Sequence, residues 1–198
     1  MLNIKVFSDF ACPFCYIATG IFDNLKKDNI DFTVDWIPYE MHPDIPVEGI
    51  SVEFKNPKAY IEKLFEMQNN MGREYGIKYN KQEKDYNTHR ALLAGEYAKT
   101  VGKYEEFSKK VFKAYFVDLE NIGKKEILDK IAKEAGLDIN EMNHLIDAGK
   151  FDSKFDEAKK LIEKFDVEGT PTFIINDKHK IVGIRPYKQM KRSFLAYE

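Results

Sequence analysis

Both cysteines of the chain lie three positions apart near its start, in the stretch FSDFACPFCY at residues 7–16. The residues just before them, NIKVFSDF, are rich in β-branched and aromatic side chains, which is typical of a strand over residues 3–10. From Cys15 to Leu25 the apolar residues recur at helical spacing. The fold must therefore contain a junction at which a strand passes directly into a helix and two sulfurs lie together.

The remaining elements follow an order that predicts an α/β fold. The stretch DFTVDWIPYE alternates apolar and polar residues like a second strand. Residues 57–165 are helical in pattern, with glycines between the amphipathic stretches, and no strand is expected there. Near the end, Thr172–Ile175 and Lys180–Ile184 are expected to be strands, and Pro186 is expected to begin a final helix.

This order, βαβ, a helical block and ββα, predicts how the chain divides into domains. We expect residues 1–50 and 166–198 to form one four-stranded sheet with helices on both faces. Residues 51–165 are then expected to form an all-helical domain inserted into that unit. A chain of 198 residues is long enough to bury the core that this arrangement needs.

Charge and hydropathy narrow the classes of partner. The 31 basic and 33 acidic side chains give a net charge of −2, so no electrostatic feature favours nucleic acid. No apolar run approaches the ~20 residues needed to cross a bilayer, and no membrane partner is expected. The start, MLNIKVF, lacks the basic flank and the small-residue cleavage site of a signal peptide, which predicts a cytoplasmic location. In that reducing compartment a lone cysteine pair is more often catalytic or metal-bound than a permanent crosslink.

The predicted position of the cysteines suits thiol chemistry. The thiolate is the attacking species in disulfide exchange, and a helix N-terminus stabilises negative charge through its unpaired N–H groups and dipole. We therefore expect Cys12 to be an exposed nucleophile with a lowered pKa. Cys15 lies one helical turn deeper on the same face, within disulfide range, and is expected to be covered and to resolve the mixed disulfide. Pro13 fits the first turn, because it has no N–H to lose there.

Zinc coordination and two unrelated core cysteines are the alternatives for this pair. A structural zinc ion needs four ligands, and the chain has no second CxxC motif. Its four histidines are scattered, without the spacing of a metal site. No metal is therefore expected.

A second motif, EGTPTF, places Pro171 at the start of a predicted strand. Taken alone, an ordinary trans proline is the better interpretation, since cis bonds are rare even before proline. In combination with a CxxC at the other end of the frame, we expect the Thr170–Pro171 bond to be cis. The backbone of Thr170 would then face the two sulfurs, and an extended client segment would pair with that edge as an added strand.

Together these features resemble the thioredoxin superfamily, and the position of the helical insert resembles its DsbA branch. More narrowly, DFACPFCYIA, WIPYEMHP, NTHRALLAGEYA and VEGTPTFIIND are similar to the FrnE-like dithiol–disulfide oxidoreductases and isomerases. The resemblance covers nearly the whole chain. It implies that Cys12 and Cys15 are the redox pair and that Pro171 is the cis proline beside them.

The resemblance also implies the partners and the substrate-binding residues. These are thiol- or disulfide-containing client proteins or small thiols, with no bound cofactor and with glutathione as a candidate co-substrate. Thr170, Pro13 and Phe14 are the expected substrate-binding residues. DsbA itself has a histidine between its cysteines; here Phe14 cannot stabilise a thiolate as an imidazolium does, so we expect a less oxidising pair.

Several other side chains have two interpretations. Phe10 and Trp36 are expected in the core rather than in a substrate groove, whereas Phe14 is expected to point outward. Glu40 is expected to be a solvated loop residue rather than a proton relay to Cys15. His89 is expected in the first turn of a helix rather than in a catalytic role.

Two rival functions fit parts of the same pattern. The glutathione S-transferase kappa and hydroxychromene-carboxylate isomerase enzymes share the branch, but they activate glutathione with a serine at the first active position, where this chain has Cys12. An adaptor of thioredoxin fold, which binds a client without catalysis, is the second. The sequence carries no signal for the direction of electron flow or for an oligomeric state.

Overall fold

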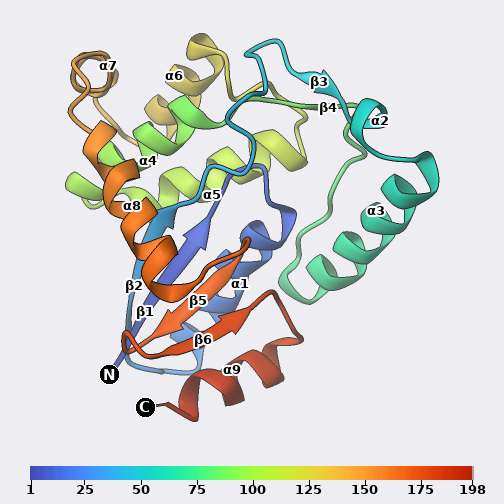
Figure 1. Cartoon of the computed structure of the whole chain (residues 1–198), viewed down its shortest axis with the longest axis vertical. Helices are drawn as coiled ribbons and strands as arrows, with labels where there is room; N and C mark the ends of the chain where they lie inside the picture. The colour runs from blue at the N-terminus through green and yellow to red at the C-terminus, as the bar shows by residue number, and fades with distance from the viewer. Residues whose placement is uncertain (198) are drawn as a thin grey trace.

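A computed structural model describes residues 1–197. Its centre is a four-stranded sheet in the order β2-β1-β5-β6 (Figure 1). The strands are β1 (Leu2–Ser8), β2 (Phe32–Pro38), β5 (Thr172–Ile175) and β6 (His179–Val182). The pair β1–β2 is parallel, and β1–β5 and β5–β6 are antiparallel. The first two strands and the last two thus meet in one sheet, as the sequence predicts.

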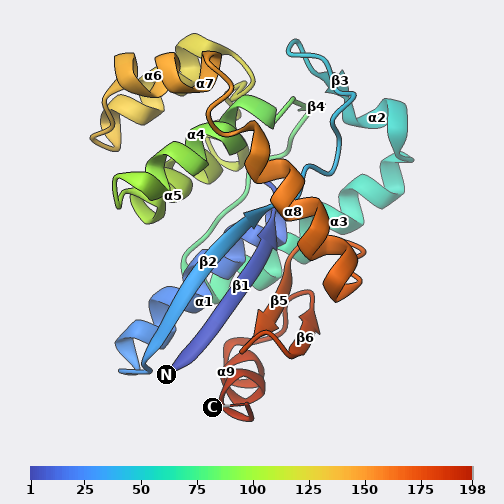
Figure 2. The same cartoon turned by 60° about the vertical axis from the view of Figure 1, so that its left-hand side comes forward.

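Helices cover both faces of this sheet (Figure 2). On one face, α1 (Pro13–Lys27) and α9 (Tyr187–Leu195) pack against Ile4 and Val6 of β1. On the other face, α8 (Asp152–Phe165) packs against Phe7 of the same strand. Successive residues of β1 therefore point into the cores on opposite faces of the sheet, because side chains alternate along a strand. The architecture is the α/β fold expected from the element order, and it matches the thioredoxin-like fold that the resemblance implies.

The segment between β2 and α8 is mainly helical, with one correction. Its elements are β3 (Ile50–Ser51), α2 (Val52–Lys55), α3 (Lys58–Gly72), a 3₁₀ turn (Arg73–Tyr75), β4 (Lys84–Asp85), α4 (His89–Thr100), α5 (Tyr104–Phe116), α6 (Lys125–Glu134) and α7 (Ile139–Asp147). Strand β4 lies within residues 57–165, where no strand was expected, and pairs with β3 in an antiparallel ribbon. Two-residue strands are too short to show a period of two, which is why the pattern missed them.

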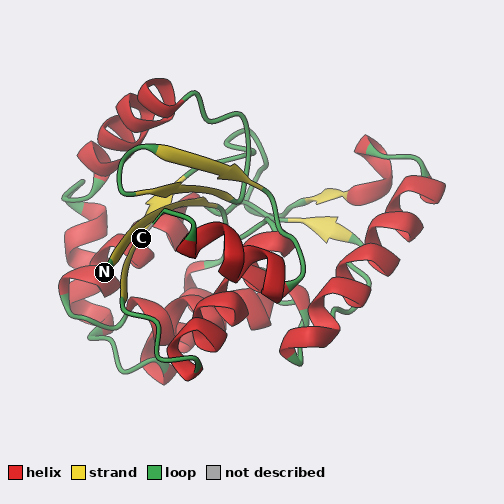
Figure 3. Ribbon diagram, turned by 90° about the horizontal axis from the view of Figure 1, so that it is seen from below, coloured by secondary structure: helices red, strands yellow, loops and turns green. Residues whose placement is uncertain are grey.

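The ribbon and α3 project from one side of the molecule (Figure 3). Tyr60 and Met67 of α3 are exposed. Among residues 1–197, no helix has both the length and the apolar character needed to cross a bilayer.

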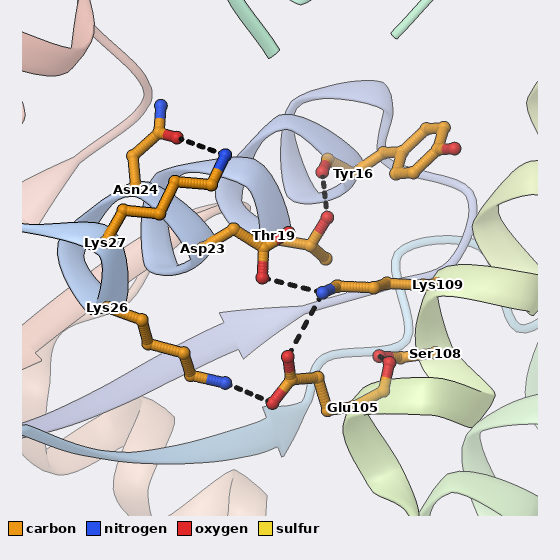
Figure 4. A network of polar contacts seen from close by, with 9 residues as sticks. All are labelled: Tyr16, Thr19, Asp23, Asn24, Lys26, Lys27, Glu105, Ser108 and Lys109. Carbon is orange, nitrogen blue, oxygen red and sulfur yellow. Dashed lines mark hydrogen bonds and ion pairs between the residues drawn. The ribbon is translucent and has the colours of Figure 1, made fainter. Parts of the chain in front are cut away.

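Ion pairs connect α1 to α5 at the C-terminal half of α1 (Figure 4). Lys109 Nζ lies 2.6 Å from Asp23 Oδ1 and 3.1 Å from Glu105 Oε1. Lys26 pairs with the other oxygen of Glu105. Partly exposed pairs of this kind contribute at most ~1 kcal/mol each. Their consequence is positional, because they orient the helix that carries the CPFC motif against the helical segment.

Candidate active site

The CPFC motif forms the first turn of α1, directly after β1. Cys12 is the N-cap residue, with extended φ and ψ of −92° and 113°, and Pro13 follows in the first turn. The Cys12 N–H donates to Asp9 O at 3.1 Å, and the Cys15 N–H donates to Cys12 O at 3.1 Å. These bonds close the junction tightly, so that both sulfurs lie at the start of the helix. Both cysteines are free thiols.

The expectation that Cys12 is exposed is wrong. Its exposed fraction is 2%, and that of Cys15 is 0%. Both belong to a core cluster that includes Phe112 and Phe116 of α5. The sequence places Cys12 at a helix start, which is usually accessible, but helices distant in sequence pack around this one. Phe10 and Trp36 are buried, as expected.

Burial alone raises the pKa of the Cys12 thiol, but hydrogen bonds that favour the thiolate outweigh burial, and the pKa is lowered overall. The strongest of these bonds comes from the Cys15 thiol; Thr170 and the backbone N–H groups of Cys15 and Phe14 add to it. The lowered pKa agrees with the sequence prediction. Its cause is a set of specific donors at the helix N-terminus.

Cys15 has the opposite character. Burial raises the pKa of its thiol well above the ordinary value, and the hydrogen bond and charge of Cys12 raise it further. Bonds from Ser8 and from the Asp9 backbone oppose this rise only in part. Of the two thiols, Cys12 therefore ionises first, while the Cys15 thiol beside it keeps its proton to higher pH.

The Thr170–Pro171 bond is cis, as expected from the sequence. Cys12 Sγ lies 3.5 Å from the carbonyl oxygen of Thr170 and donates to it while protonated. The Thr170 hydroxyl lies 3.1 Å from Met41 Sδ. Pro171 itself is buried, and its carbonyl oxygen accepts from the Gly183 N–H at 2.8 Å. The EGTPTF motif, 158 residues away in sequence, thus forms one wall of the thiol site.

Pro13 and Phe14 are half-buried, so Phe14 points outward less than expected. Pro13 and Ala11 line one side of a cavity of about 310 Å³ that extends from the CPFC turn to α3. Its apolar wall includes Met41, Leu64 and Phe116. This cavity is the concave apolar space that directly adjoins the turn between the cysteines.

Glu40 is not the solvated loop residue that the sequence suggests. Its side chain is 16% exposed, and its two carboxylate oxygens lie 3.1 and 3.2 Å from Nδ1 of His89. This contact raises the pKa of His89. His89 is the first residue of α4, as expected. The pair joins the loop after β2 to the helical segment.

Two residues for which the sequence predicts no role also hold the site together. The carboxylate of Asp9, which is 0% exposed, accepts from the Ala11 N–H at 3.1 Å and from the Met41 N–H at 2.7 Å. Tyr79 donates from its hydroxyl to the carbonyl oxygen of Pro13 at 2.7 Å. An acidic residue at the end of an apolar strand is a weak signal for Asp9. Tyr79 lies in a loop with no signal at all.

Cysteine is the only metal-ligating residue type at this turn, and within residues 1–197 no three His, Cys, Asp or Glu side chains lie close enough to hold a metal ion.

The family of the chain follows from comparison of its sequence. The model of the DsbA-like thioredoxin domain matches residues 3–194. The chain belongs to the DsbA-like thioredoxin domain family.

Relatives of this DsbA-like chain cover nearly its full length. The protein YwbO of Bacillus subtilis (strain 168) is 31% identical over 179 residues, 89% of this chain and 88% of that protein. A probable DsbA oxidoreductase, SCO1869 of Streptomyces coelicolor, has a similar structure with a TM-score of 0.88, at 17% identity over 100% of this chain and 90% of that one. The cytosolic disulfide reductase DsbM of Pseudomonas aeruginosa, solved with glutathione, has a TM-score of 0.71 at 12% identity over 98% of this chain and 99% of that one. Both structures share the fold.

The electrostatics of this DsbA-like site predict a two-step titration. In the reduced protein, absorbance near 240 nm should show a first thiol ionising below ~8.5, the value of a free cysteine, and a second well above it. The donors to Cys12 and the burial of Cys15 are the causes. The Cys12→Ser variant should lose the lower step and retain the upper one. A first step at or above the free value would show that burial, rather than hydrogen bonding, governs Cys12.

Proposed function

We propose that the protein is a thiol–disulfide oxidoreductase in which Cys12 is the nucleophile and Cys15 the resolving thiol. The observation that carries the proposal is the opposite perturbation of two adjacent thiols at one helix N-terminus. One sulfur is ready to attack and the other is a proton donor beside it. Such an arrangement favours two consecutive exchanges over a permanent crosslink.

The exchange proceeds in two balanced steps. The Cys12 thiolate attacks one sulfur of a client disulfide, an S–S bond forms between Cys12 and that sulfur, and the second client sulfur leaves as a thiolate. Cys15 then gives its proton to the thiolate released in the first step and attacks Cys12 Sγ, which releases the first client sulfur as a thiolate. Two electrons have passed from the dithiol to the client, and Cys12–Cys15 is a disulfide. The reverse sequence oxidises a client dithiol.

Residues beside Cys12 are proposed to hold the client. The half-exposed Thr170 presents its backbone next to the Cys12 sulfur, where an extended segment can pair as an added strand. Pro13 and Phe14 are proposed to contact the residues next to the client sulfur. The cavity beside Pro13 and Ala11 is proposed to accept an apolar client side chain.

Glutathione is the proposed co-substrate that resets the pair. Two glutathione molecules reduce the Cys12–Cys15 disulfide and leave as one glutathione disulfide. Support comes from the shared fold of DsbM, a cytosolic reductase solved with glutathione. On the same ground, the proposed compartment is the cytoplasm. The reduction potential of the Cys12–Cys15 pair relative to that of a glutathione buffer sets the direction of electron flow. A difference of about 30 mV between the two potentials changes the exchange constant tenfold.

Turnover of a disulfide-bonded peptide in the presence of glutathione tests the proposal. The wild-type protein should accelerate reduction or oxidation of the peptide, and the double variant Cys12→Ser/Cys15→Ser should fall to the uncatalysed rate. The variant should remain folded, because serine is nearly isosteric with cysteine. If the wild type shows no turnover, while it and the double variant bind the same client equally, the chain is a binding adaptor and the proposal is wrong.

A further inference from the structure

Tyr79 reaches the CPFC turn from a distant part of the chain. It lies in the loop between the 3₁₀ turn and β4, and its exposed fraction is 1%. Its hydroxyl donates to the carbonyl oxygen of Pro13 at 2.7 Å, across 66 residues of sequence. Pro13 is the residue that follows Cys12, so this bond ends inside the redox motif itself.

The acceptor belongs to a peptide group that also contacts the thiolate. The carbonyl of Pro13 and the N–H of Phe14 are the two ends of one amide, and the Phe14 N–H is a donor that lowers the pKa of Cys12. A donor on the carbonyl end polarises the amide and makes its N–H more positive, so hydrogen bonds in such a chain strengthen one another. The hydroxyl of Tyr79 is thus connected to Cys12 Sγ through a single peptide unit.

The position of the Tyr79 hydroxyl is fixed by contacts of its backbone and of its ring. Asn69 of α3 accepts from the Tyr79 N–H at 3.0 Å, and its Nδ2 donates to the Tyr79 carbonyl oxygen at 3.4 Å. The ring of Tyr79 packs edge-on against Tyr16 and Phe116, with centroids 5.9 and 5.5 Å apart. Both the backbone and the ring of Tyr79 are therefore fixed before its hydroxyl meets Pro13.

The hydroxyl also remains a donor over the whole range in which the thiols titrate. Burial raises the pKa of Tyr79 far above its ordinary value, and the negative charges that Tyr16, Cys12 and Cys15 acquire would raise it further. Tyr79 therefore keeps its proton when Cys12 loses its own.

We propose that Tyr79 is a positioning residue that sets the reactivity of Cys12 by polarising the Pro13–Phe14 peptide. Through it, α3 and the following loop adjust the acidity of a thiol carried by α1. The inference rests on the proposed exchange function for its consequence, a more oxidising dithiol, since a stabilised thiolate favours the reduced form. Its direct effect, on thiol acidity, belongs to the resting protein.

The test is Tyr79→Phe, which keeps the ring and removes the hydroxyl. The pKa of Cys12, followed at 240 nm, should rise, and alkylation of Cys12 at neutral pH should slow. The equilibrium with a glutathione buffer should move toward the Cys12–Cys15 disulfide by a factor of about 1.3 to 5, which corresponds to polarisation by 10–30% of a charge-assisted bond. Tyr97→Phe is the matched control, because it removes a buried residue's hydroxyl that donates to Glu141 at 2.6 Å in a contact between α4 and α7.

A second variant changes the same bond in the opposite direction. Tyr79 replaced by 3-fluorotyrosine keeps a hydroxyl that is more acidic and hence a stronger donor, so the pKa of Cys12 should fall. Unchanged thiol acidity and exchange equilibrium in both variants would overturn the proposal. A shift that Tyr97→Phe reproduces would overturn it too, because the effect would then be general loosening. If the wild type shows no disulfide turnover but Tyr79→Phe still raises the pKa of Cys12, the proposed function fails and the role of Tyr79 stands.

Discussion

Replacement of Cys15 by serine is expected to leave Cys12 joined to its partners in stable mixed disulfides. The variant retains the attacking thiolate and loses the thiol that releases the client. Well-oriented intramolecular reactions reach effective molarities of about 10⁵ M or more, so external thiols at millimolar concentration replace Cys15 poorly. Non-reducing electrophoresis and mass spectrometry should show glutathione or client proteins attached to Cys12.

The matched variant Cys12→Ser should trap few partners. It retains only Cys15, whose thiol is fully buried and has a pKa well above the ordinary value, so little thiolate forms. The difference between the two variants reports the division of roles directly. Equal trapping by both would show that the assignment of nucleophile and resolving thiol is wrong.

The fold could be predicted from the sequence because the strand pattern, the helix pattern and the positions of the two motifs all indicate the same architecture. The β-branched and aromatic residues of β1, the CPFC junction and the TPTF strand all fit one frame, and the sheet order agrees with it. The ribbon of β3 and β4 was missed, because it consists of two-residue strands held by the surrounding chain.

The environment of the cysteines was only partly predictable. A helix N-terminus favours a thiolate through its unpaired N–H groups, and this local rule gave the correct direction for the pKa of Cys12. Cys12 is buried within a cluster that includes Phe112 and Phe116, about 100 residues further along the chain. No local pattern carries that information, so its exposure was predicted wrongly.

The roles of Tyr79 and Asp9 could not be predicted from the sequence either. The role of Tyr79 depends on its reaching Pro13 across the fold, and its own sequence surroundings are those of an ordinary loop. Asp9 lies next to the motif, but its partners come from two further segments, at Met41 and Thr88. Side chains whose function depends on tertiary contacts become visible only once those contacts are known.

Replacement of Asp9 by alanine is expected to cause a large loss of stability. The buried carboxylate accepts from the N–H groups of Ala11 and Met41 and from the side chain of Thr88. Without it, these donors remain buried and lack their acceptor. Each buried donor that loses its acceptor costs about 1–3 kcal/mol in the free energy of unfolding. Urea unfolding should measure the loss, and Asp147→Ala, which removes an exposed partner of Arg90, should cost ~1 kcal/mol or less.

The variant Asp9→Asn separates the hydrogen bonds of Asp9 from its charge. Burial raises the pKa of Asp9 despite these hydrogen bonds, so the folded protein holds the carboxyl proton more tightly than the unfolded chain. Stability linked to this proton is fully present below the unfolded pKa of ~3.9 and is lost as pH rises through the higher folded pKa. The free energy of unfolding of the wild type, relative to Asp9→Asn, should therefore increase as pH falls through that window. A relative stability that instead decreases on acidification would show that the hydrogen bonds from Ala11, Met41 and Thr88 outweigh burial and that the folded protein favours the carboxylate.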